Sequence, residues 1–303
     1  MGSTSDPYLF GYGGRWPDVR WPNGARVAVS LVVNYEEGAE QSVSRGAARG
    51  ERAGEVPSSM PIGAIDLAMD QMFAYGLRAG FWRVLGLLQQ FQTPATFLFC
   101  GEAVERTPDL AREAVARGHE AACHGYGWVN HALFNSEAEE ETAIQRAIDA
   151  MVRAGCGRPL GFYGRWGPSR STRRILGKLG FSYDSNAYDD DVPHYDRAVA
   201  NAPMLVLPYA LDTNDWKFFE GDPWGTPKAY LEYLVCSLET LLDEGDRGLP
   251  RVLNVGLHLR IIGRPGRAWV LREFLKHLQM LDSRVWVATR LQIARHWRAT
   301  VPP

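Results

Sequence analysis

Residues 26–38 read RVAVSLVVNYEEG. The apolar run at 26–33 is typical of a buried strand, and the polar run at 34–38 follows it directly. The strand therefore ends in two adjacent carboxylates, Glu36 and Glu37. Neighbouring carboxylates raise the cost of ionising each other, so one of them can act as a general base. The alternative interpretation is a solvated loop edge without a chemical role.

Strand-like and helix-like segments alternate from this stretch almost to the C-terminal end. The strand candidates are 26–33, 95–99, 119–123, 159–163, 181–186, 204–209, 251–257 and 284–288. The amphipathic segments are 64–91, 103–117, 137–154, 169–179, 227–243, 267–281 and 290–298. This succession is typical of a mainly parallel sheet with helices outside, and no linker or dinucleotide fingerprint interrupts it. We predict one α/β domain over residues 1–303, a distorted (β/α) barrel of about seven parallel strands with an N-terminal arm at about 1–25.

Composition excludes several classes of function. The 303 residues carry a net charge of -2, with 46% apolar and 22% charged residues. Nucleic-acid binding needs a concentrated basic face, which these scattered charges do not provide. No apolar run reaches the ~18 residues of a membrane span, and the N-terminus lacks a secretory pattern. We interpret Cys100, Cys123, Cys156 and Cys236, which show no metal-binding spacing, as reduced, buried thiols of a cytoplasmic protein.

Polar side chains follow several of the predicted strands. They are Glu36 and Glu37 after the first, His124 after the third, Arg165 after the fourth, and His258 with Arg260 after the seventh. Each alone has an ordinary explanation, since a single histidine is usually a hydrogen-bonded core residue. Because the chemistry of parallel α/β barrels gathers at the carboxyl ends of the strands, we expect these groups to meet at one mouth.

The same residues resemble, in order, the motifs of the polysaccharide-deacetylase superfamily, also called the NodB-homology fold. That family carries an Asp-Asp pair, a His-x-x-x-His motif, an Arg-x-Pro segment and a late catalytic histidine. The metal-independent allantoinase branch is more similar still, over NYEEG at 34–38, HGY at 124–126, TND at 213–215, FFEGDPWGTP at 218–227 and GLHLR at 256–260. The likeness covers nearly the whole chain and implies a hydrolase that opens a cyclic amide.

The expected metal site is incomplete. Sugar deacetylases of the family bind a divalent cation with a second histidine four residues after the first, and that position here is Trp128. Glu37 and His124 alone give two ligands, whereas a catalytic zinc normally takes three from the protein. We therefore expect no cofactor and no required metal, although a third ligand from another loop, such as Asp189, stays open.

Allantoin, or a related cyclic ureide or imide, is the substrate that the resemblance implies. Glu36 would take the water's proton with Glu37 tuning it, and His258 would protonate the leaving nitrogen. His124 and Arg165 would bind the carbonyl and stabilise the oxyanion. The remaining candidates are substrate-binding residues: Tyr35, Trp128, Trp166, Asn214 and Arg260. For the Asn214-Asp215 pair, a structural turn or helix cap is an alternative.

Two departures from the allantoinase pattern lie beside the expected pocket. Gly127 replaces an arginine, and Trp166 replaces a small polar residue in a lengthened loop. Either a flatter, more apolar ring or allantoin itself is compatible with them. The rival functions are a carbohydrate N-deacetylase and a non-catalytic barrel scaffold. The resemblance also implies a homo-oligomer, a dimer or tetramer, with the long loop 38–62 as a lid or subunit arm.

Overall fold

The computed structural model describes residues 10–197, 203–219 and 226–303. Its central element is β1 (Val27–Tyr35), every residue of which is buried. Within the described residues β1 pairs in parallel with β2, β8 and β9, so the apolar stretch at 26–33 lies inside the sheet. The other strands are β2 (Thr96–Phe99), β3 (Glu120–Cys123), β4 (Gly161–Phe162), β5 (Tyr183–Asp184), β6 (His194–Asp196), β7 (Met204–Val206), β8 (Arg251–His258) and β9 (Val285–Val287).

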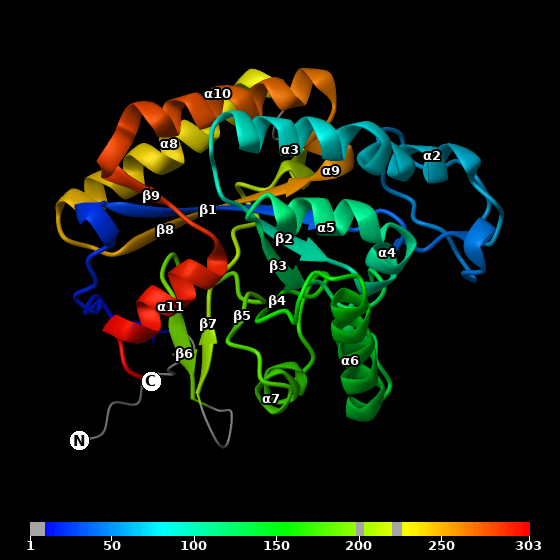
Figure 1. The fold of residues 1–303 in the computed structure, drawn as a ribbon, viewed down its shortest axis with the longest axis horizontal. Coiled ribbons are helices and arrows are strands. Elements are labelled where there is room, and N and C mark those ends of the chain that lie inside the picture. Colours follow the sequence, from blue (N-terminus) through cyan, green and yellow to red (C-terminus); the bar gives the residue numbers. More distant parts are fainter. Residues whose placement is uncertain (1–9, 198–202, 220–225) are drawn as a thin grey trace.

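The strands form a sheet in the order β6-β7-β5-β4-β3-β2-β1-β8, with β9 also on β1. The described neighbours are parallel except for β6 and β7. Figure 1 shows the sheet curling into a half-barrel, with β1 and β8 running across the view and β6 and β7 turned steeply against them. The predicted α/β barrel class is confirmed. The short antiparallel β6 was not predicted, because its residues are only partly buried and give no apolar run.

Helices cover the outside of the sheet, and α3, α8 and α10 lie together over β1 and β8 (Figure 1). The helices are α2 (Leu67–Tyr75), α3 (Phe81–Gln90), α4 (Gly101–Arg106), α5 (Pro108–Ala116), α6 (Glu137–Arg153), α7 (Thr172–Lys178), α8 (Pro227–Asp246), α9 (Leu259–Ile262), α10 (Pro265–Leu281) and α11 (Arg290–Thr300). Two predicted segments are divided. A π-helical turn, Gly76–Gly80, separates α2 from α3. Pro108 starts α5 as a new helix after α4, since proline lacks the N–H that a continuous helix needs.

The open side of the half-barrel lies between β8 and the segment after β7, and loops and side chains span it. Asn214 forms an isolated bridge with Gly256 of β8. Arg290, which is buried, donates to Asn254 Oδ1 at 2.5 Å and to the carbonyl of Pro208 at 2.9 Å. A guanidinium and one short bridge therefore tie β8 to a loop across this gap.

Residues 10–25 of the predicted N-terminal arm pack against the C-terminal part of the same chain. The Trp21 ring lies 5.9 Å from the Trp286 ring and 6.1 Å from the Trp297 ring. Residues 1–9 lie outside the described residues. Cys236 is exposed, which corrects the prediction of four buried thiols, because it lies on an outer turn of α8; the other three cysteines are buried. Among the described helices, none combines the length and the apolar character needed to cross a bilayer.

Candidate active site

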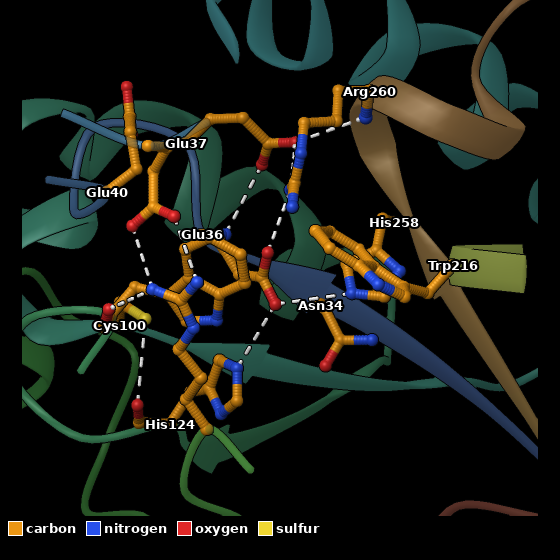
Figure 2. Close-up of polar contacts among 12 residues, drawn as sticks. Asn34, Glu36, Glu37, Glu40, Cys100, His124, Trp216, His258 and Arg260 are labelled. Carbon is orange, nitrogen blue, oxygen red and sulfur yellow. Dashed lines mark hydrogen bonds and ion pairs between the residues drawn. The ribbon is translucent and has the colours of Figure 1, made fainter. Parts of the chain in front are cut away.

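The register of the sheet brings the predicted polar groups to one place. Asn34 of β1 pairs with His258 at the end of β8, so Glu36, just beyond β1, lies beside that histidine. Glu36 Oε1 is 3.3 Å from His258 Nε2 and 3.2 Å from His124 Nε2. Arg260 Nη1 lies 2.8 Å from the other oxygen, Oε2 (Figure 2). One buried carboxylate is thus surrounded by two imidazoles and a guanidinium.

Asp215 holds His258 from the opposite side. Its Oδ1 is 2.6 Å from His258 Nδ1. Burial lowers the pKa of His258, but the carboxylates of Glu36 and Asp215 outweigh it and raise that pKa to about 9. At neutral pH His258 is therefore a protonated imidazolium that can donate a proton. The sequence contained Asp215 in the TND motif, but nothing in its spacing assigned it to His258, 43 residues away.

The pKa values of the two glutamates are shifted in opposite directions. Burial would raise the pKa of Glu36, yet His258 and Arg260 hold it well below its usual range. Burial raises the pKa of Glu37 to about 7, opposed by Arg260 and reinforced by Glu36. A raised pKa was expected for one of the pair, and it belongs to the carboxyl that lies behind the site rather than to the one that faces it.

His124 is fixed in one orientation by its surroundings. Its Nδ1 contacts the carbonyl oxygen of Tyr163, which can only accept, so Nδ1 carries a hydrogen. Its Nε2 faces Glu36 Oε1 at 3.2 Å, and as an N–H it donates to that carboxylate oxygen. The imidazole also stacks on the Tyr163 ring, with centroids 5.4 Å apart and planes 7° apart. Backbone and ring contacts together set the orientation of His124.

Arg260 is a partner of the glutamates. Its Nη1 is 3.3 Å from Glu37 Oε1, and its backbone N–H donates to the same oxygen at 3.1 Å. The guanidinium lies 4.3 Å from the ring of Phe73 and 5.0 Å from that of Trp128. Arg260 was predicted as a substrate-binding residue, but it is buried beneath the cavity, where it compensates two carboxylates.

These groups open into a cavity of about 130 Å³. It is lined by Asn34, Glu36, His124, Trp128, Tyr163, Arg165, Trp166, Tyr188, Tyr209, Leu211, Asn214, Trp216, Lys217 and His258. Four predicted residues are not in that lining. Glu37 and Arg260 lie behind it, Asp189 is exposed, and Tyr35 points into the core, where its hydroxyl contacts Thr107 Oγ1 at 2.6 Å.

Aromatic rings make up much of the wall, and most of them were missed from the sequence. Tyr163, Tyr209 and Trp216 stood in apolar or loop contexts that gave no reason to choose them above other aromatics. A signal existed for Trp216, which directly follows the TND motif. The cavity therefore suits a small ligand with a flat face, since aromatic walls favour stacked or edge-on rings.

Arg165 reaches the cavity with its terminal nitrogens already engaged. Its Nη1 and Nη2 donate to the two carboxylate oxygens of Glu51 at 2.7 and 2.9 Å. Its guanidinium lies 3.5 Å from the Trp128 ring. Only Nε is buried and lacks a partner among the described residues. Glu51 belongs to the long loop 38–62, so that loop covers one side of the site.

Two further wall residues have unusual local structure. Trp166 has φ of 68°, a left-handed conformation that is uncommon outside glycine, and its carbonyl accepts from Tyr188 at 2.7 Å.

Asn214 caps the short helix η5 (Asp215–Phe218), because its Oδ1 accepts from the backbone N–H of Trp216 at 2.8 Å. Asn214 is thus both the helix cap considered as an alternative and a lining residue.

The donor set does not fit a divalent cation. The residue four after His124 is Trp128, whose indole is not a ligand. Glu36, His124 and His258 converge, but both imidazoles contact one carboxylate oxygen directly, and the Arg260 guanidinium occupies the other. Among the described ranges, no group of three or more His, Cys, Asp or Glu side chains is arranged to hold an ion.

Known proteins resemble this chain over its length. The profile of a family described as polysaccharide deacetylase matches residues 66–183. A Schizosaccharomyces pombe (strain 972 / ATCC 24843) protein named "Putative polysaccharide deacetylase" is 33% identical over 304 residues, covering 93% of each chain. The crystal structure of Puue allantoinase has a TM-score of 0.92 at 37% identity, covering 100% of both chains. That of a "probable Polysaccharide deacetylase" from Pseudomonas aeruginosa PAO1 has a TM-score of 0.91 at 38% identity, covering 99% of this chain and 100% of the other.

Proposed function

Because this chain belongs to the polysaccharide deacetylase family, a family of hydrolases, we propose that it hydrolyses the C–N bond of a cyclic amide such as allantoin or a related ureide or imide. The observation that supports this proposal most strongly is the arrangement of groups in the cavity. A carboxylate, Glu36, and an imidazolium, His258, lie 3.3 Å apart in a small space walled by tryptophan and tyrosine rings. The full-length likeness to an allantoinase supports the same substrate class.

The proposed reaction uses Glu36 as base and His258 as acid. A water oxygen forms a bond to the ring carbonyl carbon while Glu36 takes one of the water's protons. The C–N bond then breaks with its electron pair on nitrogen, and His258 Nε2 gives its proton to that nitrogen. The products are a carboxylic acid and an N–H group in the opened chain. Through their direct contact Glu36 can return its proton to His258, which restores both groups.

Substrate entry also prepares the base. In the free protein, contact with His258 and Arg260 keeps Glu36 strongly acidic and hence a weak base. A ring and a water inserted between Glu36 and His258 would separate these charges and make the carboxylate more basic. We assign the oxyanion to His124 and to the unpaired Nε of Arg165, without a metal ion.

The alternative is a carbohydrate N-deacetylase. The family profile and the names of two relatives favour it. Against it stands the poor fit of the donor set to a cation.

One incubation separates the possibilities. Purified protein is given allantoin, hydantoin, succinimide, dihydrouracil and an N-acetylglucosamine oligomer in parallel, with ring-opening and acetate release as readouts. We expect ring-opening of at least one cyclic amide, lost in Glu36→Gln and His258→Ala. Acetate release without ring-opening would replace the proposal with the sugar deacetylase, and silence towards all five would favour a non-catalytic scaffold.

A further inference from the structure

Tyr209 has a hydroxyl group in the cavity whose oxygen accepts two hydrogen bonds. Asn34 Nδ2 donates to it at 3.1 Å, and Asn214 Nδ2 donates to it at 2.9 Å. Tyr209 is 1% exposed and belongs to the cavity lining.

The direction of both bonds is fixed by the other contacts of the two asparagines. Asn34 Nδ2 also donates to the carbonyl of Leu257 at 3.1 Å, and a carbonyl can only accept. Asn214 Oδ1 accepts from the N–H of Trp216, so its other atom must be the amide nitrogen. Neither side-chain amide can be turned round without losing a bond.

The hydrogen of the Tyr209 hydroxyl therefore has no acceptor among the described residues. A phenol has one hydrogen to donate, and both contacts use its oxygen as acceptor. No described residue accepts from it. Buried polar groups are nearly always hydrogen-bonded, so a free donor in a cavity wall indicates a ligand acceptor or an ordered water.

The position of this donor is set by rigid neighbours. The Tyr209 ring stacks on Tyr163 with centroids 4.3 Å apart and planes 14° apart, and Tyr163 stacks in turn on His124. Asn34, which anchors the hydroxyl, pairs in register with His258. Gly256 makes room for the hydroxyl, because a Cβ at that position would overlap it. The donor thus lines the same cavity as the acid, the base and the imidazole of the site.

We propose that Tyr209 donates a hydrogen bond to the carbonyl oxygen of the scissile amide and stabilises the oxyanion formed when water adds. This assignment rests on the proposed amide hydrolysis, and Tyr209 gives up no proton in it. Burial raises the pKa of the phenol, so the hydroxyl remains a neutral donor across the working pH range. Preformed donors of this kind act mainly on the transition state, because the developing charge strengthens the bond.

The test compares Tyr209→Phe with Tyr183→Phe. Both residues are fully buried, but the Tyr183 hydroxyl donates to Glu120 at 2.7 Å and does not line the cavity. On whichever amide of the panel turns over, we expect Tyr209→Phe to lower kcat by about 10²-fold with KM changed less than about 3-fold. Tyr183→Phe should keep kcat within about 3-fold of wild type, and unfolding curves of both variants check the fold. A kcat near wild type in a folded Tyr209→Phe would overturn the proposal.

A binding measurement keeps this test independent of the substrate class. A cyclic phosphonamidate, whose tetrahedral P–O⁻ group imitates the oxyanion, and planar succinimide are titrated against tryptophan fluorescence. Tyr209→Phe should weaken the phosphonamidate at least about 10-fold and leave succinimide nearly unchanged. Equal affinity of the wild-type protein and Tyr209→Phe for the phosphonamidate would overturn the role of Tyr209. Loss of activity on the sugar oligomer alone would keep Tyr209 as a donor and overturn the cyclic-amide substrate instead.

Discussion

The carboxylate of Asp215 accepts hydrogen bonds from both the ring and the backbone of His258. Oδ1 is 2.6 Å from the ring Nδ1, and Oδ2 accepts from the backbone N–H at 2.8 Å. A second backbone N–H, of Ile262, donates to Oδ2 at 3.0 Å. One side chain thus fixes the orientation of the imidazole and ties it to the short helix α9 that follows.

Removing that carboxylate charge should weaken the acid. We expect Asp215→Asn to lower kcat by about 10²- to 10⁴-fold and to lower the pKa of His258, because an amide neither attracts the imidazolium nor enforces the same tautomer. The matched control is Asp212→Asn, since exposed Asp212 accepts from Tyr233 and is absent from the cavity lining. The measurement is a pH–rate profile of each variant. An unchanged alkaline limb in Asp215→Asn would show that Asp215 does not tune His258.

The wild-type profile should report His258 directly. Its folded pKa of about 9 lies above the ordinary 6.5, so the acid form persists at neutral pH and kcat/KM should fall above about pH 9. Protonated His258 should also stabilise the fold. This stabilisation is complete below about pH 6.5 and is lost as the pH rises through about 9. Urea unfolding from pH 6 to 10 measures it, with His258→Gln as reference. A variant whose pH dependence matches wild type would contradict this assignment.

Gly76 should be sensitive to the smallest side chain. A Cβ there would overlap the carboxyl of Glu37, so Gly76→Ala is expected to destabilise the fold by about 1–3 kcal/mol and to reduce activity by displacing Glu37. Gly86 lies on an exposed position of α3 where an added methyl group would have nothing within 4 Å, so Gly86→Ala should stabilise by about 0.5–1 kcal/mol. Denaturant melts and initial rates compare the two. Equal effects would show that Glu37 can move without cost.

Trp166 should matter for binding more than for stability. Its left-handed backbone costs about 1–2 kcal/mol in a non-glycine residue, so Trp166→Gly should keep the unfolding free energy within about 1 kcal/mol of wild type. Loss of the aromatic wall should raise KM about 10-fold. Asn23→Gly, at φ of 59° on an exposed turn, is the control for the backbone change and should leave KM unaltered. A KM for Trp166→Gly equal to that of the control would remove Trp166 from the binding wall.

Chelation tests the metal-free proposal. Prolonged dialysis against a chelator should leave turnover unchanged, because the Arg260 guanidinium already compensates Glu36 at 2.8 Å. Metal analysis before and after dialysis accompanies the assay. Activity that is lost and then restored by zinc would contradict the proposal.

The sequence predicted the strands and the meeting of Glu36, His124 and His258 because these depend on local patterns. An apolar run predicts a strand, and parallel strands bring their following residues to one edge. The sequence did not predict where the side chains of Arg260 and Tyr35 lie. Along an extended chain His258 and Arg260 would share a face, but α9 begins at Leu259 and turns Arg260 under the glutamates. Tyr35 points to the opposite side of β1 from Asn34, as alternation along a strand requires.

The sequence also did not predict contacts between residues that are far apart in the chain. The engagement of Arg165 by Glu51 joins residues 114 positions apart, and no spacing rule signals it. The same holds for Tyr209, whose importance appears only when Asn34 and Asn214 are seen to approach it from two elements. Contacts of this kind depend on how loops close over the sheet, which the residue pattern of a single sequence does not determine.

The gap beside β8 has a consequence for how such a site can diversify. The segment that fills it carries Tyr209, Asn214 and Asp215, yet its ladder contact with β8 is a single bridge, Asn214 with Gly256. Exchanging a strand would shift the pairing of every neighbour, whereas this segment can be lengthened or rebuilt while β8 keeps its register with β1. Asp215, which binds the acid, and Tyr209, which donates to the carbonyl, could thus change together. The protein would then act on a different ring while the sheet stayed the same.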